Sequence, residues 1–448
     1  MDPLTLGVGG FVTILILLMA RVPIAFALGS VAVVCTLTFY SWPVGGEFDI
    51  VRGWKAAAPV LTSNTYDFVH SFELIMLPLF IGLSHLAFHS RITTDIYYAM
   101  RLFLARIPGG LAIASIMGCG GFSAITGSSV ACAAAMGRIC TPEMLQAGYG
   151  RRLATSSVAV GGTLGSLIPP SVPFILYGIF TEQSISKLFM AGILPGLISL
   201  LAFIIVVVVW VKANPAEAPV VRLALKPGDR RRAAFNTWPA ILLFGIICIG
   251  IFGGFITTTE AAAISVVVAT IIGVALKRLT YASFIHSLRE TAYQTAMIFL
   301  IAFGAKIFVS FISLTGVAPW LIAELQGANL SNWMIIGLIT IAFLILGMFL
   351  DPIGILLLTL PITVPLVDEM GYNLIWFGVI VVKLLEIGLI TPPVGLNAFV
   401  VKSVIDRDIP VHTIFAGISR FLIAEVIVLG LLLGFPILSL LLPDTFLG

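Results

Sequence analysis

Residues 161–178 read GGTLGSLIPPSVPFILYG, and this stretch decides how the chain must fold. It is apolar enough to lie within a membrane, yet Pro169 and Pro170 interrupt it. Proline has no backbone N–H, and in a helix its ring clashes with the carbonyl four residues earlier. We therefore predict a broken helix, in which the carbonyls of Gly165 and Ser166 lose their helical donors and face the tip of a neighbouring hairpin.

A second stretch repeats the pattern. Residues 388–393 read GLITPP, with the same spacing from the glycine to the proline pair. Here Pro392 and Pro393 would free the carbonyls of Gly388 and Leu389. At membrane depth, free carbonyls are tolerated only where they are buried in protein or line a watery cavity, and they suit a hard cation there. A broken helix used twice predicts a transporter built from two halves.

The composition is that of a helical membrane protein. Of the 448 residues, 59% are hydrophobic and only 10% are charged, whereas soluble proteins carry about 25% charged residues. Apolar runs of about 20 residues, the length of a membrane-spanning helix, follow one another along the chain. We predict an all-α polytopic membrane protein without a large soluble domain. Any water-soluble partner should then be a separate chain, and no nucleic-acid partner is expected.

A basic linker over residues 211–236 divides the chain and should face the cytoplasm. We predict a first repeat over residues 1–210, with scaffold helices over 1–106, a hairpin over 109–137, a broken helix over 153–178 and a span over 188–210. We predict a second repeat over residues 237–448, with scaffold helices over 237–330, a hairpin over 333–366, a broken helix over 374–404 and a last span over 412–435.

The charges orient the two halves in opposite directions. Lysine and arginine accumulate on the cytoplasmic side of a membrane, which places there the linker, Arg138, Arg151, Arg152, Lys277, Arg278, Lys402 and Arg407. Residues 307–382 contain no lysine or arginine and should face outside. The first hairpin then enters from the cytoplasm and the second from outside, so we predict inverted-topology repeats with two re-entrant hairpins.

The two repeats also agree in register. Pro392 lies 223 positions after Pro169. The same offset relates Ser128, at the polar kink of the first hairpin, to Asp351, at the kink of the second. A single offset that aligns both the hairpin tips and the breaks supports an internal repeat.

The first candidate site joins the tip of the first hairpin to the first break. The tip offers hydroxyls from Ser123, Thr126, Ser128 and Ser129, and the break offers the carbonyls of 165–170. Neutral oxygens suit Na⁺, whereas proton coupling needs a titratable group that this site lacks. The alternative is that these small residues only allow helices to approach closely.

The second candidate site mirrors the first, with Gly347 and Asp351 at the hairpin facing Gly388 and Thr391 at the break. An ionisable group at membrane depth is costly unless it has a partner. Asp351 therefore either neutralises a bound cation or caps the half-helix that Pro352 begins, and the sequence favours neither reading.

Several residues could bind an anionic substrate. The half-helix that begins at Ser128 and Ser129 carries partial positive charge at its N-terminus. Lys306, in an apolar stretch, either pairs with a substrate carboxylate or sulfonate or extends to the membrane surface. Asn397 could donate to the same anion. Lys383 and Glu386, three residues apart, are predicted to form an internal ion pair, and Glu260 to cap a helix.

Sequence patterns of enzymes and pumps are missing. The chain has no HExxH zinc motif, no GxSxG at a strand–helix turn and no Walker loop. Asp67 and Asp351 are the only candidates for a membrane protease dyad, and neither lies in a GxGD setting. We therefore expect no enzymatic activity and no ATP-driven transport by this chain alone.

Six motifs closely resemble the large membrane subunit of TRAP transporters, the DctM-like family. They are GSSVACAAAMG (127–137), PEMLQAGY (142–149), GGTLGSLIPPSVPFILYG (161–178), AGILPGL (191–197), FLDPIGILLLTLPITVPL (349–366) and GLITPPVGLNAFVVK (388–402). The resemblance implies an elevator-type, Na⁺-coupled importer of a small organic acid in the bacterial inner membrane. It also implies two partners, a small four-helix membrane subunit (Q) and a periplasmic substrate-binding protein (P).

The resemblance also implies two Na⁺ sites. The first would fall on Ser123, Thr126, Gly165, Ile168 and Pro170, and the second on Gly347, Gly388, Thr391 and Val394. The family usually shows Thr-Pro-Thr-Glu where this chain has Thr257–Glu260, and commonly a serine where Thr126 keeps the hydroxyl. Since the chain starts at the large subunit's first helix, we expect the small subunit to be a separate polypeptide.

Two alternatives to this reading remain open at this point. One is a self-sufficient Na⁺/dicarboxylate symporter or exchanger of similar hairpin architecture, which would need no binding protein. The other is an ion channel with re-entrant loops, against which two hairpins that enter from opposite faces argue. The sequence does not identify the organic acid.

Overall fold

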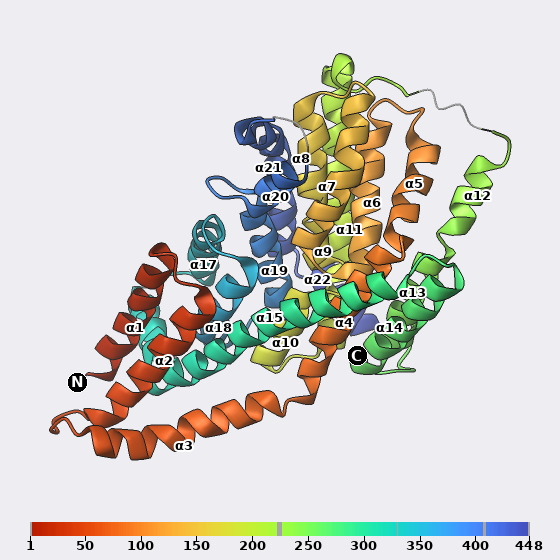
Figure 1. The fold of residues 1–448 in the computed structure, drawn as a ribbon. Helices are drawn as coiled ribbons and strands as arrows, with labels where there is room; N and C mark the ends of the chain where they lie inside the picture. The colour runs from red at the N-terminus through yellow and green to blue at the C-terminus, as the bar shows by residue number, and fades with distance from the viewer. Residues whose placement is uncertain (1, 222–225, 329, 406–408, 447–448) are drawn as a thin grey trace.

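The computed structural model describes residues 2–221, 226–328, 330–405 and 409–446 (Figure 1). Arg222 of the linker and Arg407 lie outside the described residues. In the described part of the chain, all regular secondary structure is helical, and nine helices are long and apolar enough to cross a membrane. The prediction of an all-helical, multi-span membrane protein is therefore confirmed.

The N-terminal helices are α1 (Pro3–Met19), α2 (Ile24–Ser41), α3 (Ile50–Val69), α4 (Met76–His89) and α5 (Ile92–Leu104), with a short 3₁₀ turn η1 (Phe72–Ile75) before α4. Helix α3 begins at Ile50, directly after Asp49, whose carboxylate accepts from the N–H groups of Val51 and Arg52. In Figure 1, α3 lies along the lower edge of the molecule.

Helix α15 (Tyr281–Thr315) is 35 residues long and crosses the molecule (Figure 1). It packs on α2 and on α4, and α4 in turn packs on α14 (Thr258–Ala275). The contact with α2 is close: a Cβ added at Gly304 would lie 2.9 Å from the carbonyl oxygen of Ala25. The Thr280 hydroxyl accepts from the Ser283 N–H and caps the start of the helix.

Both predicted hairpins are present. The first consists of α6 (Gly110–Thr126) and α7 (Ser129–Gln146), and the second of α17 (Asn332–Gly347) and α18 (Pro352–Glu369). Helix α7 continues through Pro142 to Gln146. The carbonyl that loses its helical donor to this proline belongs to Arg138, an exposed residue four positions earlier.

Both predicted breaks are present as well. The first divides α8 (Arg151–Gly161) and α9 (Leu164–Leu167) from α10 (Val172–Thr181), and the second divides α19 (Leu374–Ile390) from α20 (Leu396–Val404). Each proline pair contains a cis peptide bond. In the apolar, membrane-spanning segment of the first broken helix 94% of residues are buried, whereas in that of α11 (Ile185–Ala213) 33% are buried. The broken backbone is thus enclosed by protein, as its unpaired carbonyls require.

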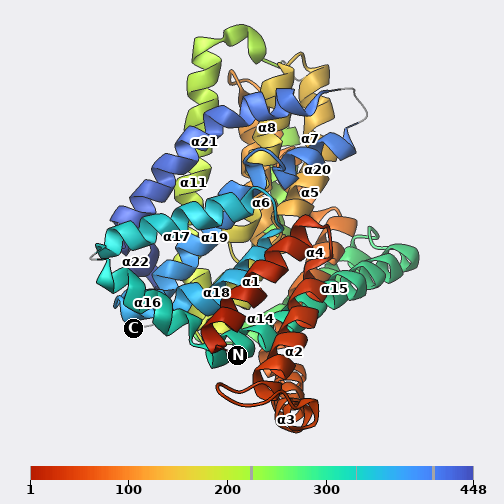
Figure 2. The same cartoon turned by 90° about the vertical axis from the view of Figure 1, so that its left-hand side faces the viewer.

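The remaining helices complete the layers around these elements. They are α13 (Trp238–Phe252), α16 (Val317–Gly327), α21 (Val411–Gly434) and α22 (Ile437–Phe446), with η2 (Pro215–Glu217) and α12 (Asp229–Asn236) in the linker. Helices α11 and α21 pack together (Figure 2). The sequence did not predict α22. At the start of α14, Thr257 and Glu260 form the expected capping box.

Candidate substrate and ion site

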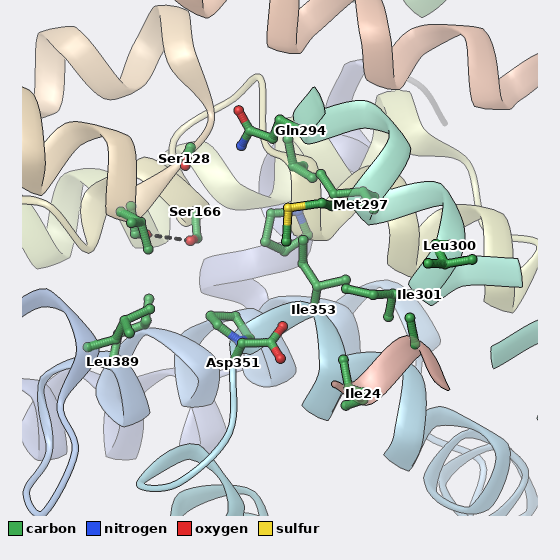
Figure 3. A pocket seen from close by; sticks show the side chains of 18 of the residues that line it. Ile24, Ser128, Ser166, Gln294, Met297, Leu300, Ile301, Asp351, Ile353 and Leu389 are labelled. Atoms are coloured by element: carbon green, nitrogen blue, oxygen red, sulfur yellow. Dashed lines mark hydrogen bonds between the residues drawn. The ribbon is translucent and has the colours of Figure 1, made fainter. Parts of the chain in front are cut away.

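A cavity of about 670 Å³ lies between the two hairpin tips and α15 (Figure 3). Its polar wall consists of Ser128, Ser129, Ser166, Gln294 and Asp351. The rest of the lining is mainly aliphatic, contributed chiefly by α2, α10, α15 and α18, with single residues from α7, α19 and α20. A mostly apolar cavity of this size with a few convergent polar groups is typical of a small-molecule site.

The tip of the first hairpin touches the first break directly. A Cβ added at Gly165 would lie 2.7 Å from the Ser128 carbonyl carbon. Gly127 turns the tip at a φ of +63°, and a Cβ there would lie 2.3 Å from the Pro170 carbonyl oxygen. The Val172 N–H donates to the Gly127 carbonyl at 3.3 Å. The predicted juxtaposition of tip and break is therefore present, and it requires glycine at both contacts.

One hydroxyl at this tip has no hydrogen-bond partner in the part of the chain that the structure describes. The Ser123 hydroxyl donates to the Cys119 carbonyl at 2.6 Å, and the hydroxyls of Ser129 and Ser166 lie 2.5 Å apart. The Thr126 side chain is 2% exposed, and its Oγ1 finds no partner among the described residues. A buried polar atom without a partner is costly, so this oxygen is the strongest indication of a missing ligand here.

The carbonyls of the first break behave differently from one another. The prediction that Ser166 presents a free carbonyl is wrong, because the Ser171 hydroxyl donates to it. The Gly165 carbonyl lacks its helical donor, as predicted, because Pro169 has no N–H to donate to it. The Ile168 N–H donates to the Leu164 carbonyl instead. The Ile168 side chain points towards α11, where a Cβ at Gly196 would lie 2.8 Å from its Cγ1.

The second hairpin meets the second break through two glycines. A Cβ added at Gly388 would lie 2.7 Å from the Cα of Gly347. The Gly388 carbonyl is not free as predicted, because the Thr391 N–H donates to it at 3.2 Å, while the Thr391 hydroxyl donates to the Ile387 carbonyl. The Val394 N–H donates to Met348 at 3.3 Å and joins the break to the hairpin.

Asp351 performs the capping role that the sequence left open. Its Oδ2 accepts from the Gly354 N–H at 2.9 Å at the start of α18. The same carboxylate also faces the cavity, opposite Ser166 (Figure 3). Asp351 can therefore cap α18 and face a ligand in the cavity at the same time.

Two predicted substrate residues lie away from this cavity. Lys306 is half-buried on α15 beyond Ile301 and is not among the lining residues. Asn397 is fully buried, and its amide nitrogen donates to the Ala159 carbonyl of α8 at 3.2 Å. This contact joins the two broken helices. A role for either residue in binding substrate stays a prediction.

A buried charge cluster contains the predicted ion pair and extends it. Lys383 Nζ lies 3.4 Å from Glu386 Oε2, as the sequence indicated. It also contacts Glu425 of α21 and lies 2.9 Å from the Ser199 hydroxyl of α11. All three charged side chains are fully buried. Sequence reasoning missed Glu425, although an acidic residue within the apolar stretch FLIAEVIVLG is a signal of a buried partner.

The family model for the DctM component of the tripartite ATP-independent periplasmic transporter matches residues 11–438. The chain is 32% identical over 425 residues to the sialic acid TRAP transporter large permease protein SiaM of Vibrio cholerae, covering 92% of this chain and 97% of SiaM. It is 35% identical over 345 residues to the C4-dicarboxylate TRAP transporter large permease protein DctM of Pseudomonas aeruginosa, covering 76% and 79% of the two chains.

A third relative is the isethionate TRAP transporter permease protein DctMQ of Oleidesulfovibrio alaskensis, 32% identical over 409 residues, which cover 91% of this chain and 61% of that protein. Among solved structures, the YdaH transporter of Alcanivorax borkumensis superposes with a TM-score of 0.63 at 14% identity, over 98% of this chain and all of YdaH. The Neisseria gonorrhoeae efflux pump MtrF gives a TM-score of 0.60 at 13% identity, over 96% and 95% of the chains. At this identity the similarity concerns the fold.

Proposed function

This chain belongs to the DctM family of TRAP transporter large permeases, multi-pass bacterial membrane proteins that are not enzymes, and on this premise we propose that it imports a small organic anion together with Na⁺. The buried Thr126 hydroxyl, which has no partner among the described residues, carries the proposal, together with the tip contact at Gly165. The Thr126 hydroxyl and the Gly165 carbonyl are neutral oxygens, which suit a monovalent cation.

The first Na⁺ would be held by oxygens of Ser123, Thr126, Gly165, Ile168 and Pro170. The donor set fits a hard cation: Thr126 Oγ1 has no other partner, and Ser123 donates its only proton to Cys119, which leaves its lone pairs free. Ser166 lies outside this set, and its carbonyl accepts from the Ser171 hydroxyl.

The second Na⁺ would be held at Gly347, Gly388, Thr391 and Val394. The Thr391 hydroxyl donates to Ile387 and keeps its lone pairs for an ion. The Asp351 carboxylate, at the start of α18, would add negative charge near the path of the ions and the substrate. Sodium would thereby reduce the repulsion between Asp351 and an anionic substrate.

The substrate would occupy the cavity between the tips. Its volume of about 670 Å³ suits a single small acid, and the serines at the N-terminus of α7 offer hydroxyl donors to a carboxylate or sulfonate. The relatives named for sialic acid, C4-dicarboxylates and isethionate support an anion of this class. We propose that the two repeats have inverted topology and that hairpins and broken helices move together as an elevator past α15.

We further propose that two partners complete the transporter, a small membrane subunit and a periplasmic binding protein that delivers the substrate. The tripartite description of the family and the relative named DctMQ support this assembly. The alternative, a self-sufficient symporter, would transport without a binding protein.

Reconstitution in proteoliposomes tests these proposals separately. With both partners present, uptake of the cognate acid should require an inward Na⁺ gradient, and full uptake driven by protons alone would refute Na⁺ coupling. Uptake that persists without the binding protein would favour the self-sufficient symporter. A thermal-shift screen of organic acids and sulfonates on the cognate binding protein would identify the substrate.

A further inference from the structure

Outside the cavity, three histidines and one glutamate converge where α4 faces α15. His85 and His89 are four residues apart on α4, and His286 and Glu290 are four residues apart on α15. Residues with this spacing share a helix face. Since α4 and α15 pack together, the two pairs face each other.

The Glu290 carboxylate lies at the centre of this His/Glu cluster. Its Oε2 is 3.3 Å from His85 Nδ1 and 3.1 Å from His89 Nε2, and its Oε1 is 3.4 Å from His286 Nε2. One ligand atom from each of His89, His286 and Glu290 lies within 4.8 Å of the other two. The His89 and His286 rings meet edge to face, with centroids 5.3 Å apart.

These separations are those of atoms that share a tetrahedral metal ion. Zinc binds imidazole nitrogen and carboxylate oxygen at about 2.0–2.1 Å, and a tetrahedron with such bonds has edges of about 3.4 Å. The three nitrogen–oxygen distances in the cluster are 3.3, 3.1 and 3.4 Å. The ligand atoms of His89, His286 and Glu290 all lie within 4.8 Å of one another, so these three side chains can converge on one ion. His85 would move towards them to complete the set.

A neighbouring amide orients one of the rings towards such an ion. His85 Nε2 lies 3.1 Å from Gln294 Oε1. In the tautomer in which this nitrogen donates to the amide oxygen, Nδ1 directs its lone pair at the Glu290 carboxylate, 3.3 Å away. A cation between the two groups would stabilise this arrangement. An outer hydrogen bond that selects the ligating nitrogen is usual for metal-bound histidine.

We propose that His85, His89, His286 and Glu290 bind a divalent transition-metal ion, with Zn²⁺ as the best-fitting member of the class. Imidazole with one carboxylate suits zinc and cobalt, whereas magnesium and calcium prefer oxygen alone. The His286 side chain is 57% exposed and Glu290 39%, so an ion can enter from the surface. The bound ion would fasten the end of α4 to α15, just before Arg91 begins the connection to α5.

The test is a cobalt titration of the full-length protein, purified in detergent without a polyhistidine tag and stripped with a chelator. We expect one Co²⁺ per chain, with the intense visible absorption of a tetrahedral site, and displacement by Zn²⁺. His286→Ala and Glu290→Gln should abolish this absorption. Gln294→Ala should weaken Co²⁺ binding by about 10- to 100-fold, because it removes only the outer hydrogen bond.

Matched controls are His70→Ala and His412→Ala, which alter exposed histidines outside the cluster and should leave the titration unchanged. The proposal is overturned if the wild-type protein takes up no stoichiometric Co²⁺, or if His286→Ala binds it equally well. The four residues would then form only a hydrogen-bonded cluster. If a variant fails to fold, the unfolding temperature of the wild-type protein provides the test. It should rise when Zn²⁺ is added and fall back to its original value when the chelator is added. If the temperature does not rise with Zn²⁺, the site is refuted.

Discussion

Ser128 and Asp351 lie 223 positions apart in the sequence, yet each is the N-cap of the second helix of its hairpin and each lines the same cavity. Ser128 accepts from the Ala131 N–H and Asp351 from the Gly354 N–H, so both use the same local interaction three residues ahead. The pair differs in charge. The two tips are thus equivalent in structure but present a hydroxyl on one side of the cavity and a carboxylate on the other.

Replacing Asp351 by asparagine should remove the negative charge of this side chain while keeping its hydrogen bond to the start of α18. Asparagine caps as well as aspartate, so thermal stability should change little, whereas Asp351→Ala should cost about 1 kcal/mol. We expect Asp351→Asn to raise the Na⁺ concentration for half-maximal uptake. The control Asp49→Asn changes the same kind of cap on α3, away from the cavity. Unchanged Na⁺ dependence in Asp351→Asn would restrict this residue to capping.

Thr126→Val should remove the proposed sodium ligand without breaking a hydrogen bond. Since the Thr126 hydroxyl has no partner among the described residues, the variant should unfold at the same temperature or slightly higher. We expect a several-fold higher Na⁺ concentration for half-maximal uptake. Thr141→Val is matched, because the Thr141 hydroxyl is also buried without a partner in the described structure but lies further along α7. An equal effect of both substitutions on Na⁺ dependence would argue against a sodium ligand at Thr126.

Gly388→Ala should damage the contact between the second hairpin and the second break. The added methyl would lie 2.7 Å from the Cα of Gly347, and relieving such overpacking typically costs about 1–3 kcal/mol. We expect a lower unfolding temperature and impaired uptake. Gly337→Ala on α17 has open space and should be stable or slightly stabilised. Wild-type stability of Gly388→Ala would show that this contact can relax freely.

Lys383→Met should destabilise the protein strongly. It would leave the carboxylates of Glu386 and Glu425 buried without their shared cation, and breaking such a pair costs about 3–5 kcal/mol. Adding Glu425→Gln should restore part of the loss, as a double-mutant cycle would measure. The exposed Glu260→Gln should cost far less. If Lys383→Met unfolds at the wild-type temperature, the cluster contributes nothing to stability.

Local chemistry explains what was predictable from the residues. A proline pair breaks a helix wherever it lies, and the breaks fall at Pro169–Pro170 and Pro392–Pro393 as expected. The capping box at Thr257–Glu260 likewise depends on residues three apart. The predicted free carbonyls of Ser166 and Gly388 failed for an equally local reason. A nearby Ser171 hydroxyl and Thr391 N–H replaced the donors that the prolines removed.

By itself, the sequence determined the membrane-helical class, the two hairpins and the two breaks, because hydrophobic length, missing N–H groups and end caps act within a few residues. Only the tertiary structure decided which distant side chains meet. It placed Glu425 and Ser199 against Lys383, and His85 and His89 against Glu290. The reason is physical: in an apolar interior, helix packing sets the partner of a buried polar group, and no periodicity along the chain encodes that choice.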